Sequence, residues 1–282
     1  MSFYNKQSEL KPLLNSLLEA KNTIGFVPTM GALHEGHLSL MRESLTNNSV
    51  TVVSVFVNPT QFNNPEDLKK YPRTIESDIE KIKNLNSSII VYAPEIDDIY
   101  EGKTISNSFD FDGLEFQMEG KHRPRHFDGV GTIVKKLFEI VQPTNAYFGE
   151  KDFQQLAIIK KLVQKHHIPV NIIGCEIYRE ENNLAMSSRN ERLAANERAN
   201  ASFIYQTLIE AKKLFGTKSA KEVTDWVTKI FGKQKMFTLE YFEIADEATL
   251  LKCKKKNKNK KFRAFIAVFV NNIRLIDNIS LK

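Results

Sequence analysis

The stretch between residues 24 and 45 places the strongest constraint on the fold of this chain. A short apolar run ends at Pro28, and a glycine-containing loop follows it. Beyond the loop, apolar residues recur at the spacing of one helical face, at Leu38, Met41 and Leu45. This order predicts a strand, a tight loop and a helix. Such a loop faces the free backbone N–H groups and the positive dipole end of the helix, which together bind anions and above all phosphate.

Two histidines, His34 and His37, stand at the start of the predicted helix and bracket Glu35 and Gly36. Imidazole N–H groups donate hydrogen bonds to phosphate oxygens, and glycine lets a nucleotide approach the backbone closely. Two other interpretations are open, namely polar residues at a helix start or half of a zinc site. Zinc sites need three or four ligands, and the remaining histidines, at 122, 126, 166 and 167, show no ligand spacing. The surrounding strand–loop–helix pattern favours phosphate.

Strand and helix patterns alternate through residue 174. Predicted strands cover residues 23–27, 50–57, 89–93, 146–148 and 170–174, and predicted helices cover 5–21, 37–46, 75–84, 129–141 and 153–167. Residues 94–126 are predicted to be irregular. The alternation predicts an α/β fold with a Rossmann-like, doubly wound parallel sheet.

The pattern changes after residue 175. Predicted helices at 194–215 and 220–231 precede β-rich runs at 238–244, 264–270 and 274–276. We therefore predict two domains, residues 1–175 for nucleotide binding and a smaller C-terminal α+β lid domain of residues 176–282.

Polar side chains follow the ends of the predicted strands. Asn58 and Gln61 come after the second strand, and Lys151 and Asp152 come after the fourth. Because the carboxyl ends of parallel strands line a ligand crevice, these side chains are candidates for substrate contacts. For Asn58, a simple Asn-Pro turn is an alternative. The chain has no Gly-x-x-x-x-Gly-Lys loop and no nucleophile elbow. Its surplus of cations and hydrogen-bond donors fits phosphoryl-type transfer without a covalent enzyme intermediate.

The net charge of +6 comes from one segment, because residues 252–261 contain seven lysines and no acid. A solvated hairpin loop is the favoured explanation, since no arginine or aromatic residue is interleaved as single-strand binding favours. No apolar run approaches the roughly 20 residues of a membrane span. The polar N-terminus has no apolar segment of the kind that a signal peptide contains, and Cys175 and Cys253 show no disulfide framework. We therefore expect a cytoplasmic protein with no nucleic-acid or membrane partner.

Six motifs carry a resemblance to a known family. They are Phe-Val-Pro-Thr-Met-Gly-Ala-Leu-His-Glu-Gly-His (26–37), Asn-Pro-Thr-Gln-Phe (58–62), Tyr-Pro-Arg-Thr (71–74), His-Phe-Asp-Gly-Val (126–130), Tyr-Phe-Gly-Glu-Lys-Asp-Phe-Gln-Gln (147–155) and Met-Ser-Ser-Arg-Asn (186–190). In this order they resemble the pantothenate synthetases, which are ATP-dependent pantoate–β-alanine ligases. His-x-Gly-His alone marks the wider nucleotidyltransferase superfamily, and the last hundred residues contain no comparable motif.

The resemblance implies a reaction in two steps. The pantoate carboxylate attacks the α-phosphorus of ATP, which gives pantoyl adenylate and pyrophosphate. The amine of β-alanine then attacks the acyl group, which gives pantothenate and AMP. The resemblance also implies Mg²⁺ with ATP and a homodimer. Because an acyl adenylate hydrolyses in water, we expect the second domain or its Ser-Ser-Arg loop to close over ATP.

The resemblance assigns roles to individual residues. Catalysis falls to His34, His37, Lys151 and Arg189, with His37 as a stabiliser of the transition state. ATP contacts fall to Met30, Gly31, Ala32, Leu33, His34, Glu35, Gly36, His37, Gly149, Glu150, Lys151, Asp152, Tyr178, Met186, Ser187, Ser188 and Arg189. Gln61 and Gln155 would bind pantoate, and Gln61 would also bind β-alanine. Asp78 is a candidate Mg²⁺ ligand, with a solvated helix carboxylate as the alternative.

Three positions depart from the family pattern. Arg125 and Asn183 stand where the family usually has glycine, and Tyr178 replaces a smaller aliphatic residue near the adenine. Asn tolerates left-handed backbone, so we expect the turn at Asn183 to survive. Arg125 either obstructs the pocket or adds a charge at its mouth.

Two rival functions use the same features. An adenylyltransferase with a phosphorylated acceptor would share the histidine loop, but the amides of Gln61 and Gln155 suit a hydroxy acid better than a phosphate dianion. A nucleotide- or RNA-binding regulator would use the lysines of residues 252–261, and its binding would depend steeply on salt.

Overall fold

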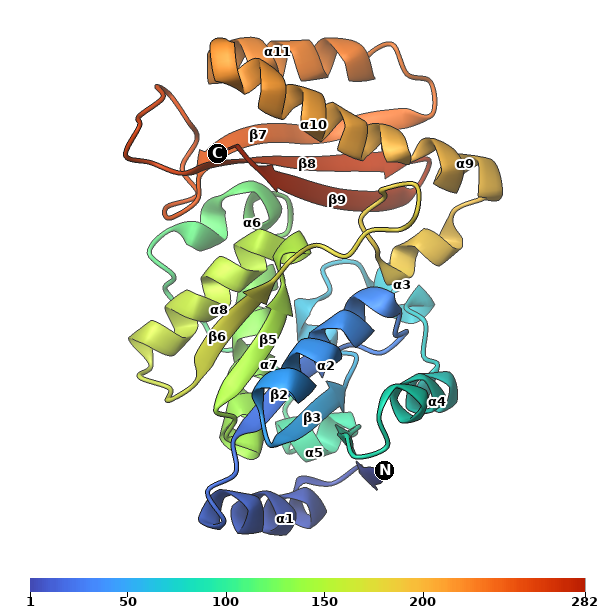
Figure 1. Cartoon of the computed structure of the whole chain (residues 1–282), viewed down its shortest axis with the longest axis vertical. Coiled ribbons are helices and arrows are strands. Elements are labelled where there is room, and N and C mark those ends of the chain that lie inside the picture. Colours follow the sequence, from blue (N-terminus) through green and yellow to red (C-terminus); the bar gives the residue numbers. More distant parts are fainter. Residues whose placement is uncertain (282) are drawn as a thin grey trace. The chain divides into compact units, whose positions relative to one another are not determined.

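A computed structural model describes residues 1–281 of the chain and divides into two compact units (Figure 1). The first unit contains residues 1–115, 119–150 and 155–176. Among the described residues, the second unit contains 116–118, 151–154 and 177–281. Segments 116–118 and 151–154, which the sequence prediction assigned to the first domain, thus group with the second unit.

The first unit is built on a parallel sheet. Within residues 1–281 this sheet has six strands in the order β1-β4-β3-β2-β5-β6. The strands are β1 (Ser2–Tyr4), β2 (Ile24–Thr29), β3 (Val50–Val55), β4 (Ile90–Tyr92), β5 (Asn145–Gly149) and β6 (Asn171–Cys175). The predicted doubly wound parallel sheet is confirmed. Strand β1 was not predicted, because three residues are too few to show a period of two.

Helices connect the strands of this sheet. They are α1 (Gln7–Glu19), α2 (Glu35–Asn47), α3 (Pro65–Lys70), α4 (Ile75–Leu85), α5 (Ile96–Tyr100), α6 (Met118–His122), α7 (His126–Val141) and α8 (Phe153–Lys165). The short helices α5 and α6 lie in the stretch predicted to be irregular. Helix α7 begins three residues before the predicted start at Gly129.

Both faces of the sheet are covered, and the two central residues of β2 show how. Adjacent residues of a strand point to opposite faces. Val27 lies in a core that includes Leu38 of α2 and Ile82 of α4. Phe26 packs edge-on against Phe138 of α7, with ring centroids 6.2 Å apart. Because β2 is buried on both sides, polar chemistry is confined to the ends of the strand.

The strand order reverses between β2 and β5. From β2 the chain proceeds through β3 to β4 on one side, and it later adds β5 and β6 on the other side. Strands β2 and β5 pair directly, with Gly25 opposite Asn145 and Phe26 opposite Ala146. In open α/β sheets, ligands bind beyond the carboxyl ends of the strands at such a reversal. The loop that contains His34 leaves β2 at this point.

The second unit is an antiparallel sheet covered by helices. In the part of the chain that the structure describes, the sheet has three strands, β7 (Phe237–Asp246), β8 (Phe262–Val270) and β9 (Ile273–Ser280). Helices α10 (Ser202–Thr217) and α11 (Ala220–Phe231) pack on it and share an apolar core with it (Figure 1). The predicted smaller C-terminal α+β domain is confirmed.

The helix predicted at residues 194–215 is wrong in one respect, because it consists of two helices. One residue separates the end of helix α9 (Ala195–Asn200) from the start of α10. The intervening Ala201 is fully buried. Its carbonyl oxygen accepts a hydrogen bond from the N–H of Ile204, which is three residues further along the chain instead of the four of an α-helix. The hydrogen-bond ladder therefore restarts at Ala201, a change that the apolar period does not reveal.

The lysine-rich segment connects β7 to β8, as predicted for a hairpin loop. Most of residues 252–261 are exposed. Lys260 pairs with Asp246 at 3.1 Å, and the ammonium of Lys256 lies over the Phe215 ring at 4.2 Å from its centroid. Part of the charge is thus neutralised or packed locally. Within residues 1–281, no helix is both long and apolar enough to cross a membrane.

The close contact of β2 with α2 gives a first prediction. A Cβ at Gly25 would lie 2.1 Å from Ser44 Oγ and 2.5 Å from Asn48 Nδ2. We expect Gly25→Ala to lower the free energy of unfolding by about 1–3 kcal/mol in urea titrations, because α2 must move away from the strand. Gly216→Ala in α10 is the control, since an added Cβ there meets no atom within 4 Å. Equal losses in both variants would contradict the steric explanation.

Candidate active site

The predicted strand, loop and helix around the two histidines are present. His34 is the N-cap of α2, and His37 lies in the first turn of this helix. The His37 Nδ1 atom accepts a hydrogen bond from the backbone N–H of His34 at 3.3 Å. The two rings are stacked, with centroids 4.0 Å apart. Because Nδ1 of His37 is an acceptor, a neutral ring carries its proton on Nε2, which is then a hydrogen-bond donor.

The loop between β2 and α2 has an unusual backbone. Gly31 and Ala32 are consecutive left-handed residues, with φ of 77° and 49°. The N–H groups of Ala32 and Leu33 donate to the two carboxylate oxygens of Asp78, at 2.9 and 2.7 Å. These two N–H groups therefore have a partner inside the protein. A contact of Ala32 or Leu33 with ATP would use other atoms of these residues.

Asp78 does not have the surroundings of a Mg²⁺ ligand. Its side chain is fully buried, and both of its oxygens accept backbone N–H groups. Among residues 1–281, no group of three His, Cys, Asp or Glu side chains has a metal-binding arrangement. Burial also contradicts the alternative of a solvated helix carboxylate. Asp78 lies on α4, and its carboxylate instead binds the backbone of the loop that precedes the histidines.

Gln61 lies beside the histidine loop. It ends a short 3₁₀ turn, Pro59–Gln61, and its Nε2 atom lies 3.3 Å from the sulfur of Met30. Its Oε1 atom accepts from the amide of Asn58 at 3.2 Å. Asn58 is fully buried, and its own Oδ1 accepts from the hydroxyl of Tyr100 at 2.6 Å. Asn58 thus orients Gln61 from inside the protein, and it does more than form an Asn-Pro turn.

The first turn of α7 supports the same region, which the sequence prediction did not identify. The Nδ1 atom of buried His126 lies 2.9 Å from the carbonyl oxygen of Gln61. A Cβ at Gly129 would lie 2.4 Å from the carbonyl oxygen of Thr60, so only glycine allows this approach. The signal was present in the motif His-Phe-Asp-Gly-Val, but the motif itself does not reveal what its residues contact.

Two of the three departures from the family pattern, Arg125 and Asn183, stand at left-handed backbone positions. Arg125 is the N-cap of α7 and has φ of 63°, a left-handed conformation that favours glycine. Its side chain is 72% exposed and pairs with Asp128 at 3.6 Å. Asn183 has φ of 70°, so the turn survives as predicted. Tyr178 is 40% exposed.

The segment that follows β5 contains further predicted residues. Gly149 is the last residue of β5. Glu150 and Gln155 both belong to the first unit. Gln155 is half-buried and lies in the first turn of α8. Lys151 and Asp152 group with the second unit and form an ion pair at 3.3 Å.

Strand β9 supports this segment. Asn278 donates to the carbonyl oxygen of Lys151 at 3.0 Å and accepts from Arg263 at 2.6 Å. The backbone at Lys151 is thus held by the second unit's own sheet.

A buried polar network holds the segment that leads to Met186, Ser187, Ser188 and Arg189. Arg179 makes two hydrogen bonds to Asp277 of β9, at 2.7 and 3.0 Å. Burial raises the pKa of the Asp277 carboxyl, and the Arg179 guanidinium opposes this rise. Asn190, fully buried at the end of the motif, donates to Glu180 at 2.7 Å and to the carbonyl oxygen of Ala185 at 3.1 Å. The partners Glu180, Ala185 and Asp277 lie outside the six motifs, so no sequence signal indicated this network.

The two thiols do not suit nucleophilic catalysis. Burial raises the pKa of Cys175 to about 11. Burial also raises the pKa of Cys253, which lies in the core of the second unit. A thiol with a raised pKa is a poor nucleophile at neutral pH. This agrees with a mechanism that needs no covalent enzyme intermediate.

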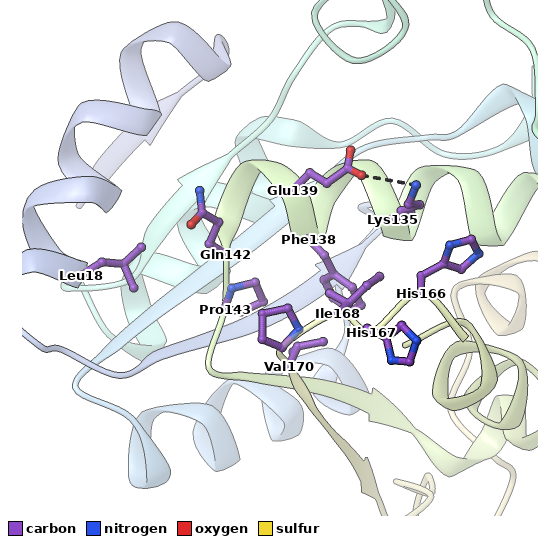
Figure 2. A pocket seen from close by; sticks show the side chains of 11 residues that line it. Leu18, Lys135, Phe138, Glu139, Gln142, Pro143, His166, His167, Ile168 and Val170 are labelled. Carbon is purple, nitrogen blue, oxygen red and sulfur yellow. Dashed lines mark ion pairs between the residues drawn. The ribbon is translucent and has the colours of Figure 1, made fainter. Parts of the chain in front are cut away.

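A separate cavity of about 590 Å³ lies in the first unit (Figure 2). It is near the amino ends of β5 and β6 and has an apolar floor that includes Phe138 and Ile168. His166 and His167 stand on its wall, and Lys135 and Glu139 pair across 3.5 Å beside it (Figure 2). None of the predicted site residues lines this cavity. It is therefore distinct from the site at the carboxyl ends of the strands.

The backbone of Arg125 gives a second prediction. A left-handed conformation costs a residue with a side chain about 1–2 kcal/mol, and glycine avoids this cost. We expect Arg125→Gly to raise the free energy of unfolding by about 1 kcal/mol and to leave activity nearly unchanged, because the side chain is exposed. The control is Lys135→Gly in the interior of α7, which should lower stability by about 1 kcal/mol. A loss of stability in Arg125→Gly would contradict the explanation.

Comparison with known proteins identifies the family. The chain matches the Pantoate-beta-alanine ligase family over residues 2–280. A pantothenate synthetase from Flavobacterium psychrophilum is 75% identical over the full length of both chains, and one from Christiangramia forsetii is 52% identical over the full length of both.

Solved structures agree with this match. A pantothenate synthetase from Thermus thermophilus is 34% identical, with a TM-score of 0.91 over 100% of this chain and 99% of the other. A pantoate-beta-alanine ligase from Francisella tularensis, complexed with beta-gamma ATP and beta-alanine, is 34% identical, with a TM-score of 0.79 over 100% of this chain and 98% of the other. These matches span almost the whole sequence, so they confirm the resemblance that the six motifs indicated. The chain belongs to the pantoate–β-alanine ligase family.

Proposed function

We propose that this protein joins pantoate to β-alanine with ATP and releases AMP and pyrophosphate. One contact carries the proposal, namely the 3.3 Å approach of Gln61 Nε2 to the sulfur of Met30. An amide suited to a hydroxy acid thus lies beside the loop proposed to hold ATP. Family membership supports the same reaction, and the Francisella tularensis relative is complexed with beta-gamma ATP and beta-alanine.

In the first step, the pantoate carboxylate attacks the α-phosphorus of ATP, and the bond to pyrophosphate breaks. Negative charge then grows on the phosphoryl oxygens and on the leaving group. The Nε2–H of His37 and the N-terminus of α2 stabilise this charge, and His34 stands beside them. A donor that is fixed before the reaction costs no reorganisation when the charge appears. Lys151 and Arg189 complete the proposed catalytic set by neutralising phosphate charge.

In the second step, the amine of β-alanine attacks the acyl carbon of pantoyl adenylate. The new C–N bond forms as the acyl–oxygen bond breaks, and AMP leaves with the electron pair. Gln61 and Gln155 hold the pantoyl group, and Gln61 also lies close to β-alanine in this proposal. Closure of the second unit or its Ser-Ser-Arg loop would exclude water from the adenylate.

The remaining nucleotide contacts are also proposals. They comprise Met30 to His37 in the first loop, Gly149, Glu150 and Asp152 after β5, and Tyr178, Met186, Ser187 and Ser188 in the second unit. We propose that Mg²⁺ arrives with ATP and is held mainly by phosphate oxygens and water, as is usual for this ion. Asp78 is not a ligand of the ion in this proposal, since both of its oxygens already accept N–H groups of the loop. A homodimer and a cytoplasmic location stay predictions.

The direct test of this function follows AMP and pyrophosphate in mixtures of the protein, Mg-ATP and pantoate, with and without β-alanine. We expect many turnovers of AMP only when β-alanine is present, because the adenylate stays bound until the amine attacks. Pyrophosphate release without AMP, seen only when a phosphorylated acceptor replaces pantoate and β-alanine, would instead indicate an adenylyltransferase. A folded protein that binds ATP and releases neither product would contradict the proposal.

The role of His37 gives a third prediction. Loss of one preorganised donor to a developing charge typically lowers kcat on the order of 10²–10³-fold, and we expect this loss in His37→Ala. Circular dichroism and thermal unfolding check that the variant folds. The control is His166→Ala, which removes a histidine from the separate cavity and should retain kcat. Nearly normal turnover in His37→Ala would exclude the role.

A further inference from the structure

Two side chains of α4 form hydrogen bonds with the backbone of the loop that precedes His34. Asp78 and Lys81 are three residues apart on this helix, so their side chains leave from neighbouring positions. Asp78 accepts the N–H groups of Ala32 and Leu33 at 2.9 and 2.7 Å. Lys81 donates from its Nζ atom to the carbonyl oxygen of Leu33 at 2.7 Å. Leu33 is therefore held at both of its backbone polar groups.

The conformation of the loop explains why these hydrogen bonds are needed. A left-handed residue with a side chain is unfavourable by about 1–2 kcal/mol, and Ala32 adopts this conformation with φ of 49°. Gly31 precedes it with φ of 77°, and a Cβ at this glycine would lie 3.1 Å from Asp78 Oδ2. Successive N–H groups in such turns form a concave anion site. Here the anion is the protein's own carboxylate.

Helix α4 is itself firmly anchored. Asp78 is fully buried and also lies 3.3 Å from the hydroxyl of Thr74, the N-cap of the helix. Ile82, one residue beyond Lys81, lies in the same apolar core as Leu33 and Leu38. The carboxylate therefore has a fixed position relative to both the loop and the start of α2.

The peptide unit between Leu33 and His34 links these contacts to His37, the proposed catalytic histidine. Its carbonyl oxygen accepts from Lys81, and its N–H donates to Nδ1 of His37 at 3.3 Å. The peptide is planar, so fixing the carbonyl also fixes the direction of the N–H. A charged donor on the carbonyl polarises the peptide and strengthens its N–H as a donor.

We propose that Asp78 and Lys81 are positioning residues that set the tautomer and orientation of His37 through the Leu33–His34 peptide. Within the loop both side chains contact backbone groups, so we infer that they act through His37. With the peptide N–H aimed at Nδ1, the ring keeps its proton on Nε2, where the proposed phosphoryl charge appears. This inference rests on the proposed function of His37, but the placement of the proton is a property of the protein without substrates.

The first experiment replaces Lys81 and measures both the ring and the rate. Lys81→Met keeps the apolar stem and removes the donor. In protein with ¹⁵N-labelled histidine, we expect the His37 signals to move away from the Nε2–H tautomer. We also expect kcat to fall about tenfold, as for a lost charged hydrogen bond, while the KM for β-alanine stays nearly constant. Lys81→Arg should restore most of both, because its guanidinium also donates to a carbonyl.

Two further variants make the experiment decisive. Lys83→Met removes an exposed lysine from the same helix and should leave the ¹⁵N signals and kcat unchanged. Asp78→Asn puts an NH₂ group against a backbone N–H, and we expect kcat to fall about 10- to 100-fold through misplacement of the loop. If Lys81→Met retains normal His37 signals and normal kcat, or if Lys83→Met loses as much as Lys81→Met, the proposal is overturned.

The two readouts separate this proposal from the proposed function. If the unaltered protein releases no AMP with all three substrates, the proposed function fails. The ¹⁵N signals of His37 in the unaltered and Lys81→Met proteins still test whether Lys81 sets the tautomer.

Discussion

The burial of β2 on both faces is the constraint on which the first unit depends. Phe26 packs toward α7 and Val27 toward α2 and α4, so neither face of the strand has room for polar groups. Chemistry is therefore confined to the end of the strand, where the chain must leave the sheet. The reversal of strand order beside β2 places a second chain exit, after β5, next to the first. The position of the candidate site follows from this arrangement of strands.

At that strand end, the protein uses its own polar groups to fix the loop before any ligand binds. Asp78 and Lys81 hold the backbone at Leu33, and Asn58 orients the amide of Gln61. The loop contains left-handed residues that would be unfavourable without these bonds. Preorganisation of this kind is what electrostatic stabilisation of a transition state requires, since donors that must move are less effective. The loop is thus built as a rigid support for the histidines.

The second unit uses a different solution, because its loops lack a parallel sheet to fix them. A buried ion pair between Arg179 and Asp277 ties the start of its proposed nucleotide segment to β9. The neighbouring Asn278 holds the backbone of Lys151. A buried ion pair contributes little net stability, but loss of one partner leaves an unpaired charge and is strongly unfavourable. The network accordingly fixes one arrangement of these segments.

Much of this protein is determined by local sequence. Apolar periods gave the alternating strands and helices, and the strand–loop–helix pattern located both histidines at a helix start. Asn183 was predicted to keep a left-handed turn, because its conformational preference is local. The tertiary structure alone decided the role of Asp78, whose backbone partners lie 45 and 46 residues away in the chain. It also decided that Asn58 orients Gln61 and that α9 ends before Ala201. A hydrogen bond between distant segments leaves no periodic signal, so only the folded chain reveals it.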